Sequence, residues 1–477
     1  MKLAKFKVLS EADIRRIHEA SLDILESCGV QLGSARMLAF LESQGLPVER
    51  DRRIVRFPRA CVEDALVRIP QRFEVFGREG QLAFVLGEGR SKIAAGHNAV
   101  FWLDSQTGRT RPATIADVEL FARICEELQA IDMIGIPVMP QDVPQPAHTL
   151  LYGVDAVIRN SSKPIFFSTD NPAINRAVIA MARAVFAGDL GSQVYAISQL
   201  SPTSPLFWEP GVLEAIMETV ETGVPLAILP EPNAGVSAPF TLAGLLTVNN
   251  VECLSGLVMI QLLKPGAKVI YANSWTTTDM RNGAALVGST ETTICRIAGA
   301  QLARFYHVPS HTTAPNSDNH AHDEQNAWEK TFSLFAAVGA GNDLIVNCGM
   351  FATGLTCSHE QLVMDEEMAA MSQRIAAGIK VNAETIAGAL IKATGPRGGY
   401  LDSEHTLKWL RSGEYIEPRV SVRGPAAVWQ AAGAKDTPAL ARETVEKYAA
   451  HPGAPLDPQR SAKLSEILRD FAETPAT

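Results

Sequence analysis

The sequence has no cysteine pairing pattern, no basic block and no apolar leader, and each absence excludes a class of protein. The seven cysteines never form a CxxC pair, which argues against a zinc-finger framework or a disulfide-stapled fold. Lys and Arg number 43 against 52 Asp and Glu, so a nucleic-acid surface is not expected. Segment 1–20 has no apolar core of a secretory signal, which predicts a cytoplasmic protein with reduced thiols. The cysteines stand at positions 28, 61, 125, 253, 295, 348 and 357.

A membrane span is not expected either, although one stretch is long and apolar. The segment Phe240–Leu263 carries Asn249, Asn250 and Glu252 well inside it. Polar side chains at these places would be costly in a bilayer, so the stretch predicts a buried helix of a soluble protein. Apolar residues make up 46% of the 477 residues, which is enough for a large core and excludes global disorder.

Short apolar strands alternate with amphipathic helices along the middle of the chain. Continuous apolar runs predict parallel strands buried on both faces, and their regular alternation favours an α/β fold of the (β/α)8 or TIM-barrel type. An open doubly wound sheet is the alternative, but no GxGxxG or GxxxxGK[ST] motif follows any strand. The seven predicted strands are Ile131–Val138, Pro164–Ser168, Val194–Ser198, Pro225–Leu229, Lys268–Ala272, Pro309–Thr312 and Leu344–Cys348.

A closed barrel needs an eighth strand, which either the Gly-rich segment 388–402 or the segment near Val420–Val422 could supply. We expect the barrel to span residues 129–400. A small α+β leader region over residues 1–128 precedes it, and a helical C-terminal arm over residues 401–477 follows it. The leader includes the short β-like run Ile93–Ala95. The helical leader and arm suggest a homo-oligomer.

Polar side chains follow most of the predicted strands, where a parallel barrel places its active site. Gln199, Glu231, Asn273 and Asn347 each stand at or just after the end of a strand. The strand ends are rich in amides, carboxylates and aromatic rings, and nearly free of Lys and Arg. A phosphate or nucleotide ligand would need basic side chains. The set therefore predicts a small cationic or zwitterionic ligand.

Aromatic side chains near the same strand ends could enclose such a ligand. A quaternary ammonium donates no hydrogen bond and is held by aromatic faces and carbonyl dipoles. Trp275, Phe351, Trp208 and the leader's Trp102 are therefore candidate walls of the site, with ordinary core packing as the alternative for each. His97 could close over the barrel mouth as part of a lid.

The string from Asp318 to Asp323 is the densest group of chemical side chains. It could bind a divalent metal, with Glu231 or Cys348 as a further ligand. One imidazole, His320 first, could instead bind a substrate carboxylate, or the loop could cap a helix that begins near Asp323. We favour substrate recognition by His320 and expect no metal site. The string contains Asp318, His320, His322 and Asp323.

Two further residues are weaker candidates. Glu291 follows Gly288-Ser-Thr and opens a helix, so it is either a helix cap or a catalytic carboxylate. Cys348 stands at a strand end and could be a nucleophile, but no paired His and carboxylate spacing supports that role. Glu291 is therefore the one candidate for a catalytic residue.

Five segments together resemble the trimethylamine methyltransferase superfamily. They are the run GAQLARFYHVPS at 299–310, the pattern Asp323-x-Gln325-x-Ala-x-Glu329, the run NCGMFATGLTCSHEQLV at 347–363, the N-terminal LSEADIRRIHEASLDILESCGV and the tripeptide His405-Thr-Leu. The likeness extends in order over almost the whole chain.

The resemblance implies a TIM barrel that moves a methyl group to a corrinoid. Trimethylamine enzymes of this superfamily carry pyrrolysine near the sixth strand, whereas this chain consists of the twenty standard residues and is similar to the branch without pyrrolysine, which includes glycine betaine demethylases. The resemblance therefore implies a quaternary amine such as glycine betaine as methyl donor. It also implies a separate protein that supplies the Co(I) corrinoid, carries methylcobalamin after transfer and docks at the barrel mouth. No tightly bound cofactor of the chain's own is expected.

Attack on an N-methyl group of a quaternary amine releases a neutral tertiary amine, so the reaction needs positioning rather than a general acid. Two other functions stay open. One is a zinc-dependent corrinoid methyltransferase for another methyl donor, in which the metal activates the leaving heteroatom. The other is a non-catalytic betaine-binding protein.

Overall fold

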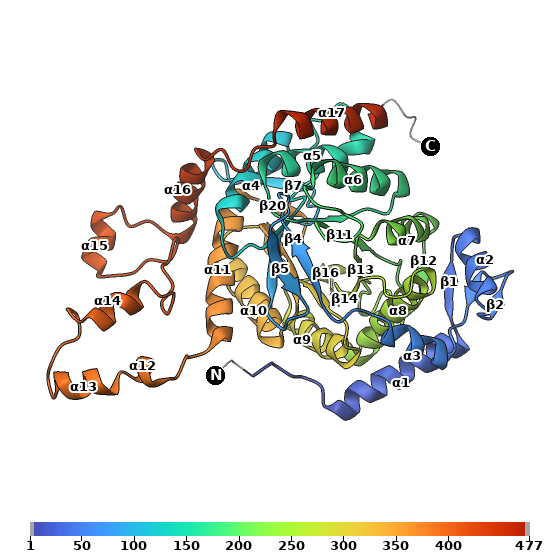
Figure 1. Cartoon of the computed structure of the whole chain (residues 1–477), viewed down its shortest axis with the longest axis horizontal. Coiled ribbons are helices and arrows are strands. Elements are labelled where there is room, and N and C mark those ends of the chain that lie inside the picture. The colour runs from blue at the N-terminus through green and yellow to red at the C-terminus, as the bar shows by residue number, and fades with distance from the viewer. Residues whose placement is uncertain (1–3, 473–477) are drawn as a thin grey trace.

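The computed structural model describes residues 4–472 and has a closed barrel of parallel strands at its centre (Figure 1). Helices follow the strands and surround the barrel, so the predicted TIM-barrel fold is confirmed. In order around the barrel the strands are β10 (Ile165–Ser168), β11 (Ala196–Leu200), β13 (Leu226–Ile228), β14 (Val269–Asn273), β17 (Ser310–Thr313), β18 (Leu344–Cys348), β6 (Lys92–Ala95) and β9 (Met133–Gly135).

All seven predicted strands are present, but the predicted place of the eighth is wrong. The first barrel strand is β6, which lies in the region assigned to the leader and pairs with β18 and β9. The segment 388–402 instead holds a helix, and Val420–Val422 is irregular. The strand β6 is only four residues long and pairs with a strand some 250 residues away in sequence, so its neighbours in the sequence give no sign of the pairing. The barrel therefore begins near residue 92, not near residue 129.

Eight helices surround the barrel, and all of them except α5 and α7 begin at a side-chain cap that satisfies one of their first N–H groups. Asp323 accepts a hydrogen bond from the backbone N of Asn326, and Ser358 accepts one from Gln361. These helices are α4 (Ile115–Glu127), α5 (Thr149–Asn160, after the 3-10 turn Pro146–His148), α6 (Pro172–Val185), α7 (Pro210–Thr222), α8 (Leu242–Leu263), α9 (Thr290–Phe305), α10 (Glu324–Ala340) and α11 (His359–Ala377).

The long apolar helix α8 is a core helix, as predicted from its internal Asn and Glu residues. It is long and apolar enough to cross a membrane by length and composition, but most of its residues are buried in the protein. The N-terminal helices α1 (Glu11–Ser27) and α3 (Arg59–Val67) pack against it on the side away from the barrel. The helix is apolar around its circumference because other elements cover it on more than one side.

Small β elements close the two ends of the barrel. The hairpin β4 (Phe73–Phe76) and β5 (Leu82–Leu86) packs its apolar side chains against the barrel interior at the end where strands begin. Two further sheets follow the carboxyl ends of strands: β19 (Met350–Phe351) and β20 (Thr356–Cys357) with β7 (Phe101–Asp104) and β8 (Arg109–Pro112), and the hairpin β15 (Thr277–Asp279) and β16 (Ala284–Leu286). In the N-terminal part, the strands β1 (Val30–Leu32), β2 (Val48–Glu49) and β3 (Ile54–Val55) form a sheet with β12 (Phe207–Trp208). The helix α2 (Ala35–Ser43) lies between β1 and β2 in the sequence.

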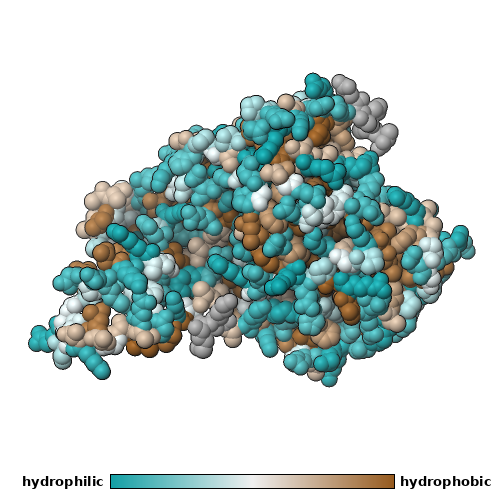
Figure 2. Space-filling model, in the orientation of Figure 1, coloured by the Kyte–Doolittle hydropathy of each residue, from teal (hydrophilic) through white to brown (hydrophobic). Residues whose placement is uncertain are grey.

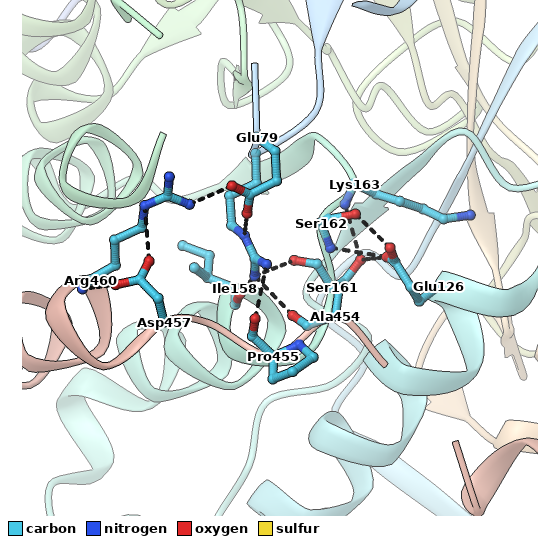
Figure 3. A network of polar contacts seen from close by, with 11 residues as sticks. Glu79, Glu126, Ile158, Ser161, Ser162, Lys163, Ala454, Pro455, Asp457 and Arg460 are labelled. Atoms are coloured by element: carbon cyan, nitrogen blue, oxygen red, sulfur yellow. Dashed lines mark hydrogen bonds and ion pairs between the residues drawn. The ribbon is translucent and has the colours of Figure 1, made fainter. Parts of the chain in front are cut away.

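The C-terminal part leaves the barrel and returns to it. The helices α12 (Ala383–Ile386), α13 (Gly388–Thr394), α14 (Glu404–Leu410) and α15 (Ala426–Ala431) project to one side (Figure 1). The chain then packs α16 (Thr437–Ala449) against α11 and α4, and α17 (Pro458–Ala472) against α5 and α6. The buried Arg78 anchors the return, because its guanidinium donates to the carbonyl oxygens of Ile158, Ser161, Ala454 and Pro455. Figure 3 labels these four residues, which come from two distant parts of the chain.

Candidate active site

A polar cavity of about 540 Å³ lies at the carboxyl ends of the barrel strands. The alternation of side chains along each strand decides which residues reach it. Ile197 and Gln199 on β11 point to the barrel axis, and so do Ala227 on β13 and Leu229 and Glu231 after it. The side chains that line the cavity are His97, Asn98, Ser168, Gln199, Ser201, Glu231, Asn233, Ser274, Thr276, Ala285, Val287, Thr313, Asn316, Asn347, Met350, Thr353 and Gly354.

The structure brings four predicted site residues together in this cavity: His97, Gln199, Glu231 and Asn347. His97 lies two residues after the end of β6 and lines the cavity wall, whereas the sequence suggested a lid. Gln199 is buried on β11, where its Nε2 lies 3.5 Å from Ser168 Oγ. Their proximity supports a common site, and the role of each in binding stays a prediction.

Asn273 and Trp275 lie outside the cavity, because successive side chains at this strand end alternate between the inward and the outward face. Ala272 and Ser274 face inward, which turns Asn273 and Trp275 outward toward helix α9. Asn273 Nδ2 donates to the His311 carbonyl oxygen and its Oδ1 accepts from Thr312 Oγ1 at 2.6 Å. A Cβ atom at Gly299 of α9 would lie 2.5 Å from Asn273 Nδ2 and 2.9 Å from the Trp275 ring. Both side chains therefore support the packing of α9 on the barrel.

The other predicted aromatic walls are also core residues. The ring of Trp102 packs edge-on against His359 with centroids 4.4 Å apart, and Phe351 lies beside His322 at 5.1 Å. Trp208 is fully buried and donates its indole N–H to Ser255 Oγ at 3.0 Å. Among residues 4–472, no Phe, Trp or Tyr side chain lines the cavity, so the predicted aromatic enclosure is wrong for this site.

The loop 318–323 caps and joins elements and does not assemble a ligand set. Asp318 accepts from the backbone N–H groups of Val287 and Gly288, and Asp323 caps α10. His320 is exposed to solvent outside the cavity. Over the described part of the chain, no group of three or more His, Cys, Asp and Glu side chains is placed to hold a metal ion.

Glu291 and Cys348 also lie away from the cavity. Glu291 is exposed in the first turn of α9, where Ser289 provides the cap. Cys348 is buried in the apolar core between the barrel and its helices, and burial raises the pKa of its thiol well above the ordinary value. The structure therefore offers neither residue for chemistry in this cavity.

A relay of hydrogen bonds fixes the protonation of His97. Asn316 Nδ2 donates to the Thr313 carbonyl oxygen at 3.1 Å, which leaves Asn316 Oδ1 to accept from Asn347 Nδ2 at 2.8 Å. Asn347 Oδ1 then faces His97 Nδ1 at 3.1 Å. Because a backbone carbonyl can only accept, each amide in the relay has one allowed orientation, and His97 Nδ1 carries the proton.

His97 is uncharged at neutral pH. Burial lowers its pKa to about 4, and the hydrogen bonds with Asn347 and Gln199 oppose this effect only in part. A second imidazole, His311, lies fully buried on β17 below the cavity, with its ring 5.3 Å from that of Phe166. Burial holds the pKa of His311 well below its usual value. Neither imidazole therefore adds positive charge to the site.

A strained backbone turn and a buried ion pair hold the relay in place. Asn347 has a φ of 130° at a register shift in β18, which turns its side chain into the cavity. Below it, Lys330 Nζ lies 3.0 Å from Asp365 Oδ2, and both side chains are fully buried. Lys330 donates to the carbonyl oxygens of Pro315 and Met350, and Asp365 accepts from the Gly349 N–H at 2.7 Å. The pair thus pins the backbone on either side of Asn316 and Asn347.

Glu231 is the one ionisable acid on the cavity wall of the described chain. Its side chain is open to the cavity but enclosed by the barrel, and this enclosure raises its pKa to about 7. Its carboxyl group has no hydrogen-bond or ion-pair partner among residues 4–472. No Lys or Arg side chain from these residues lines the cavity. The site therefore combines one unpaired carboxylate with neutral amides and hydroxyls, which suits a cationic ligand.

Residues that the sequence analysis did not select complete the wall. Ser274 and Thr313 are joined by a hydrogen bond of 3.3 Å between their hydroxyl groups, and counting alternate residues along β14 and β17 would have found them. Asn98 and Asn316 lie in irregular segments after β6 and β17, where sequence spacing gives no such signal. Asn98 Nδ2 donates to the Ser168 carbonyl oxygen at 3.2 Å.

Comparison with known proteins places the chain among methyltransferases. The family model described as "Trimethylamine methyltransferase (MTTB)" matches residues 1–474. The trimethylamine methyltransferase MttB of Desulfitobacterium hafniense strain DCB-2 is 31% identical over 97% of this chain and 93% of its own length. The glycine betaine methyltransferase of Desulfitobacterium hafniense strain Y51 is 29% identical over 98% and 97%.

A solved structure supports the fold alone. The monomethylamine methyltransferase MtmB of Methanosarcina barkeri superposes with a TM-score of 0.56 at 10% identity, over 98% of this chain and 88% of MtmB. The family match and the relatives agree with the resemblance carried by the sequence motifs. The chain belongs to the trimethylamine methyltransferase family.

Proposed function

We propose that this protein demethylates a quaternary amine, with glycine betaine as the first candidate, and passes the methyl group to the Co(I) of a separate corrinoid protein in the cytoplasm. The family and the relatives named as methyltransferases support the reaction class. The observation that carries the proposal is the unpaired Glu231 carboxyl group in a cavity whose described wall has no Lys or Arg.

Glu231 is the group that selects a cation. A quaternary ammonium cannot give up a proton to neutralise the carboxylate, so the two opposite charges persist together in the cavity and attract each other. A bound cation stabilises the ionised form and therefore lowers the pKa of Glu231 below its value of about 7 in the free protein. The uncharged His97 opposite adds no repulsion.

The reaction needs alignment and exclusion of water, and it needs no proton transfer. The reduced cobalt of the partner attacks the methyl carbon, the carbon–nitrogen bond breaks, and its electron pair stays on nitrogen as a neutral tertiary amine. Holding the bond in line can supply about 7–11 kcal/mol of the barrier. The amide relay serves this purpose, because its fixed orientations present a rigid wall to the donor.

The cavity recognises the tail of the donor through uncharged groups. The Nδ2 of Asn98 uses one N–H on the Ser168 carbonyl oxygen, and its second N–H is available to a carboxylate oxygen. Neutral donors of this kind bind a carboxylate more weakly than an Arg fork does. We therefore expect glycine betaine to be accepted together with other trimethylammonium compounds of similar size.

The test combines direct binding with turnover. Calorimetric titration of the protein with glycine betaine measures binding without any corrinoid, and the reaction with a reduced corrinoid protein is followed by its visible spectrum and by release of dimethylglycine. Glu231→Gln should lose binding and turnover, because it removes the charge and keeps the shape. Glu291→Gln, at an exposed site on α9, is the matched control and should behave as the wild type.

The outcomes separate the parts of the proposal. Equal binding by wild type and Glu231→Gln would refute the role of the carboxylate. Failure of glycine betaine together with success of another quaternary amine would change the substrate and keep the class. Tight binding without turnover with any corrinoid protein would favour a binding protein.

A further inference from the structure

The C-terminal arm exposes many large apolar side chains. No residue from 379 to 419 is buried, although this segment contains the helices α12, α13 and α14. Leu401 is 92% exposed, Tyr415 74% and Leu410 66%. The segment's other exposed large apolar residues are Ile379, Val381, Ile386, Ile391, Tyr400 and Leu407. Figure 2 shows apolar side chains on the projecting side of the molecule that Figure 1 assigns to the arm.

Polar contacts nevertheless join the helices of the arm to one another and attach its base to α11. Lys408 of α14 pairs with Glu384 of α12, and His405 Nε2 lies 3.3 Å from the Glu384 carbonyl oxygen. At its base, Arg374 of α11 pairs with Glu414, and Glu367 accepts from the backbone N–H of Val420 at 2.7 Å. Polar contacts therefore help to set the shape of the arm, while many of its large apolar side chains stay exposed to solvent. An ordered segment of this kind marks an interaction surface.

Four exposed apolar residues on two adjacent helices of the outer wall, called the α10–α11 strip here, offer apolar surface of the same kind. Trp328 and Phe332 are one turn apart on α10 and are 53% and 67% exposed. Met371 and Ile375 are one turn apart on the neighbouring α11 and are 40% and 51% exposed. None of these four residues is among those that line the cavity.

Charge selects a second copy of the chain as the occupant. The whole chain has a formal net charge of −9, so two barrel bodies brought together repel each other. The segment 379–419 contains six Lys or Arg and five Asp or Glu, which makes the arm slightly positive on an acidic protein. The arm can lie on another acidic body without adding like charge. Its length exceeds the about 20–30 residues that each side of a standard interface contributes.

We propose that the arm over residues 379–419 packs on the α10–α11 strip of a second copy of this chain, and that the second copy returns the same contact. A reciprocal contact closes at a dimer and buries both apolar surfaces of each copy at once. This inference concerns assembly and does not depend on the proposed reaction.

The test measures the mass of the full-length protein by light scattering after gel filtration. The wild type should have at least twice the chain mass of 51.4 kDa. Leu401→Asp with Leu410→Asp should give single chains, because each carboxylate would have to be buried in the contact. Phe332→Asp in the strip should give the same result. Val67→Asp, at an 86% exposed residue of α3 far along the chain, should leave the wild-type mass unchanged.

The variants carry their own control for folding. Circular dichroism and calorimetric binding of the amine should be unchanged in each single-chain variant, since every substituted side chain is exposed and outside the cavity. A wild-type mass of 51.4 kDa would overturn the proposal, and so would an intact oligomer in the Leu401→Asp, Leu410→Asp variant. A single-chain wild type whose arm variants lose association with a corrinoid protein would assign the arm to that partner instead.

Discussion

Replacing Lys330 with Met should destabilise the protein by about 3–5 kcal/mol, because it leaves the carboxylate of Asp365 buried without its counter-ion. Both side chains are fully buried and 3.0 Å apart. Burial raises the pKa of Asp365 to about 6 in spite of the neighbouring ammonium group, so desolvation already exceeds the attraction within the pair. Asp365→Asn should cost a similar amount, since it strands the ammonium group instead.

The double variant Lys330→Met, Asp365→Asn should cost about 2–3 kcal/mol, which is less than half the sum of the two single variants. It removes both charges, and the Asn oxygen can still accept from the Gly349 N–H. What it loses is the donor to the carbonyl oxygens of Pro315 and Met350, at about 1 kcal/mol or more for each unpaired carbonyl. The expected non-additivity is the signature of a coupled pair.

Urea unfolding of the four proteins, followed by circular dichroism, measures the cycle. Additive single variants, or single variants that each cost less than about 1 kcal/mol, would refute the account of a coupled buried pair. A local measurement tests the link to the cavity. Nitrogen-15 NMR of labelled histidine should show His97 protonated on Nδ1 in the wild type and a mixture of tautomers in the double variant, because the amide relay loses its support. An unchanged His97 signal would show that the relay does not depend on the pair.

Three further predictions use other parts of the structure. The folded-state pKa of Glu231 is raised to about 7, so its contribution to stability is fully present below the unfolded pKa near 4.3 and is lost as pH rises through 7. In thermal melts, Glu231→Gln should therefore be more stable than wild type at pH 8 and equal to it at pH 4. A stability difference that stays constant with pH would contradict the raised pKa. Arg78→Met should release the C-terminal return by leaving carbonyl oxygens unpaired at about 1–3 kcal/mol each, seen as faster hydrogen exchange in α17, whereas unchanged exchange would count against the anchor. Gly299→Ala should cost about 1–3 kcal/mol, because its methyl group would lie 2.5 Å from Asn273 Nδ2, and urea unfolding at wild-type stability would disprove that close packing.

The sequence predicts the barrel well, because a parallel strand buried on both faces leaves a local mark. Seven apolar β-branched runs between amphipathic segments are strands in the structure. The strand β6 is also visible in the sequence as the β-like run Ile93–Ala95, but its place in the barrel is not, since that place is defined by pairing with β18 and β9 at distant positions. Because β6 was assigned to the leader, His97 was expected in a lid, whereas it lies two residues after the strand and lines the cavity.

Errors in the predicted site have a common geometric cause. Successive side chains of a strand point to opposite faces, so only every second residue near a strand end can reach the cavity. Asn273 and Trp275 point outward for this reason. Asn347 shows the limit of this alternation, because Val346 already faces inward and only the register shift with a φ of 130° turns Asn347 into the same cavity. Alternation along the strands therefore accounts for two residues that lie outside the cavity, but it would also exclude Asn347, which lines it.

Glu231 differs from the other acidic residues near the barrel mouth in having no partner within the described chain. Asp318 holds two backbone N–H groups, Asp323 caps a helix and Asp365 faces Lys330, so each of these acids is satisfied by a local partner. Glu231 has no such partner among the described residues, and its carboxyl group is open to the cavity. The group is therefore free to pair with a cation that enters the cavity, and a ligand explains its position better than a contact within the fold does.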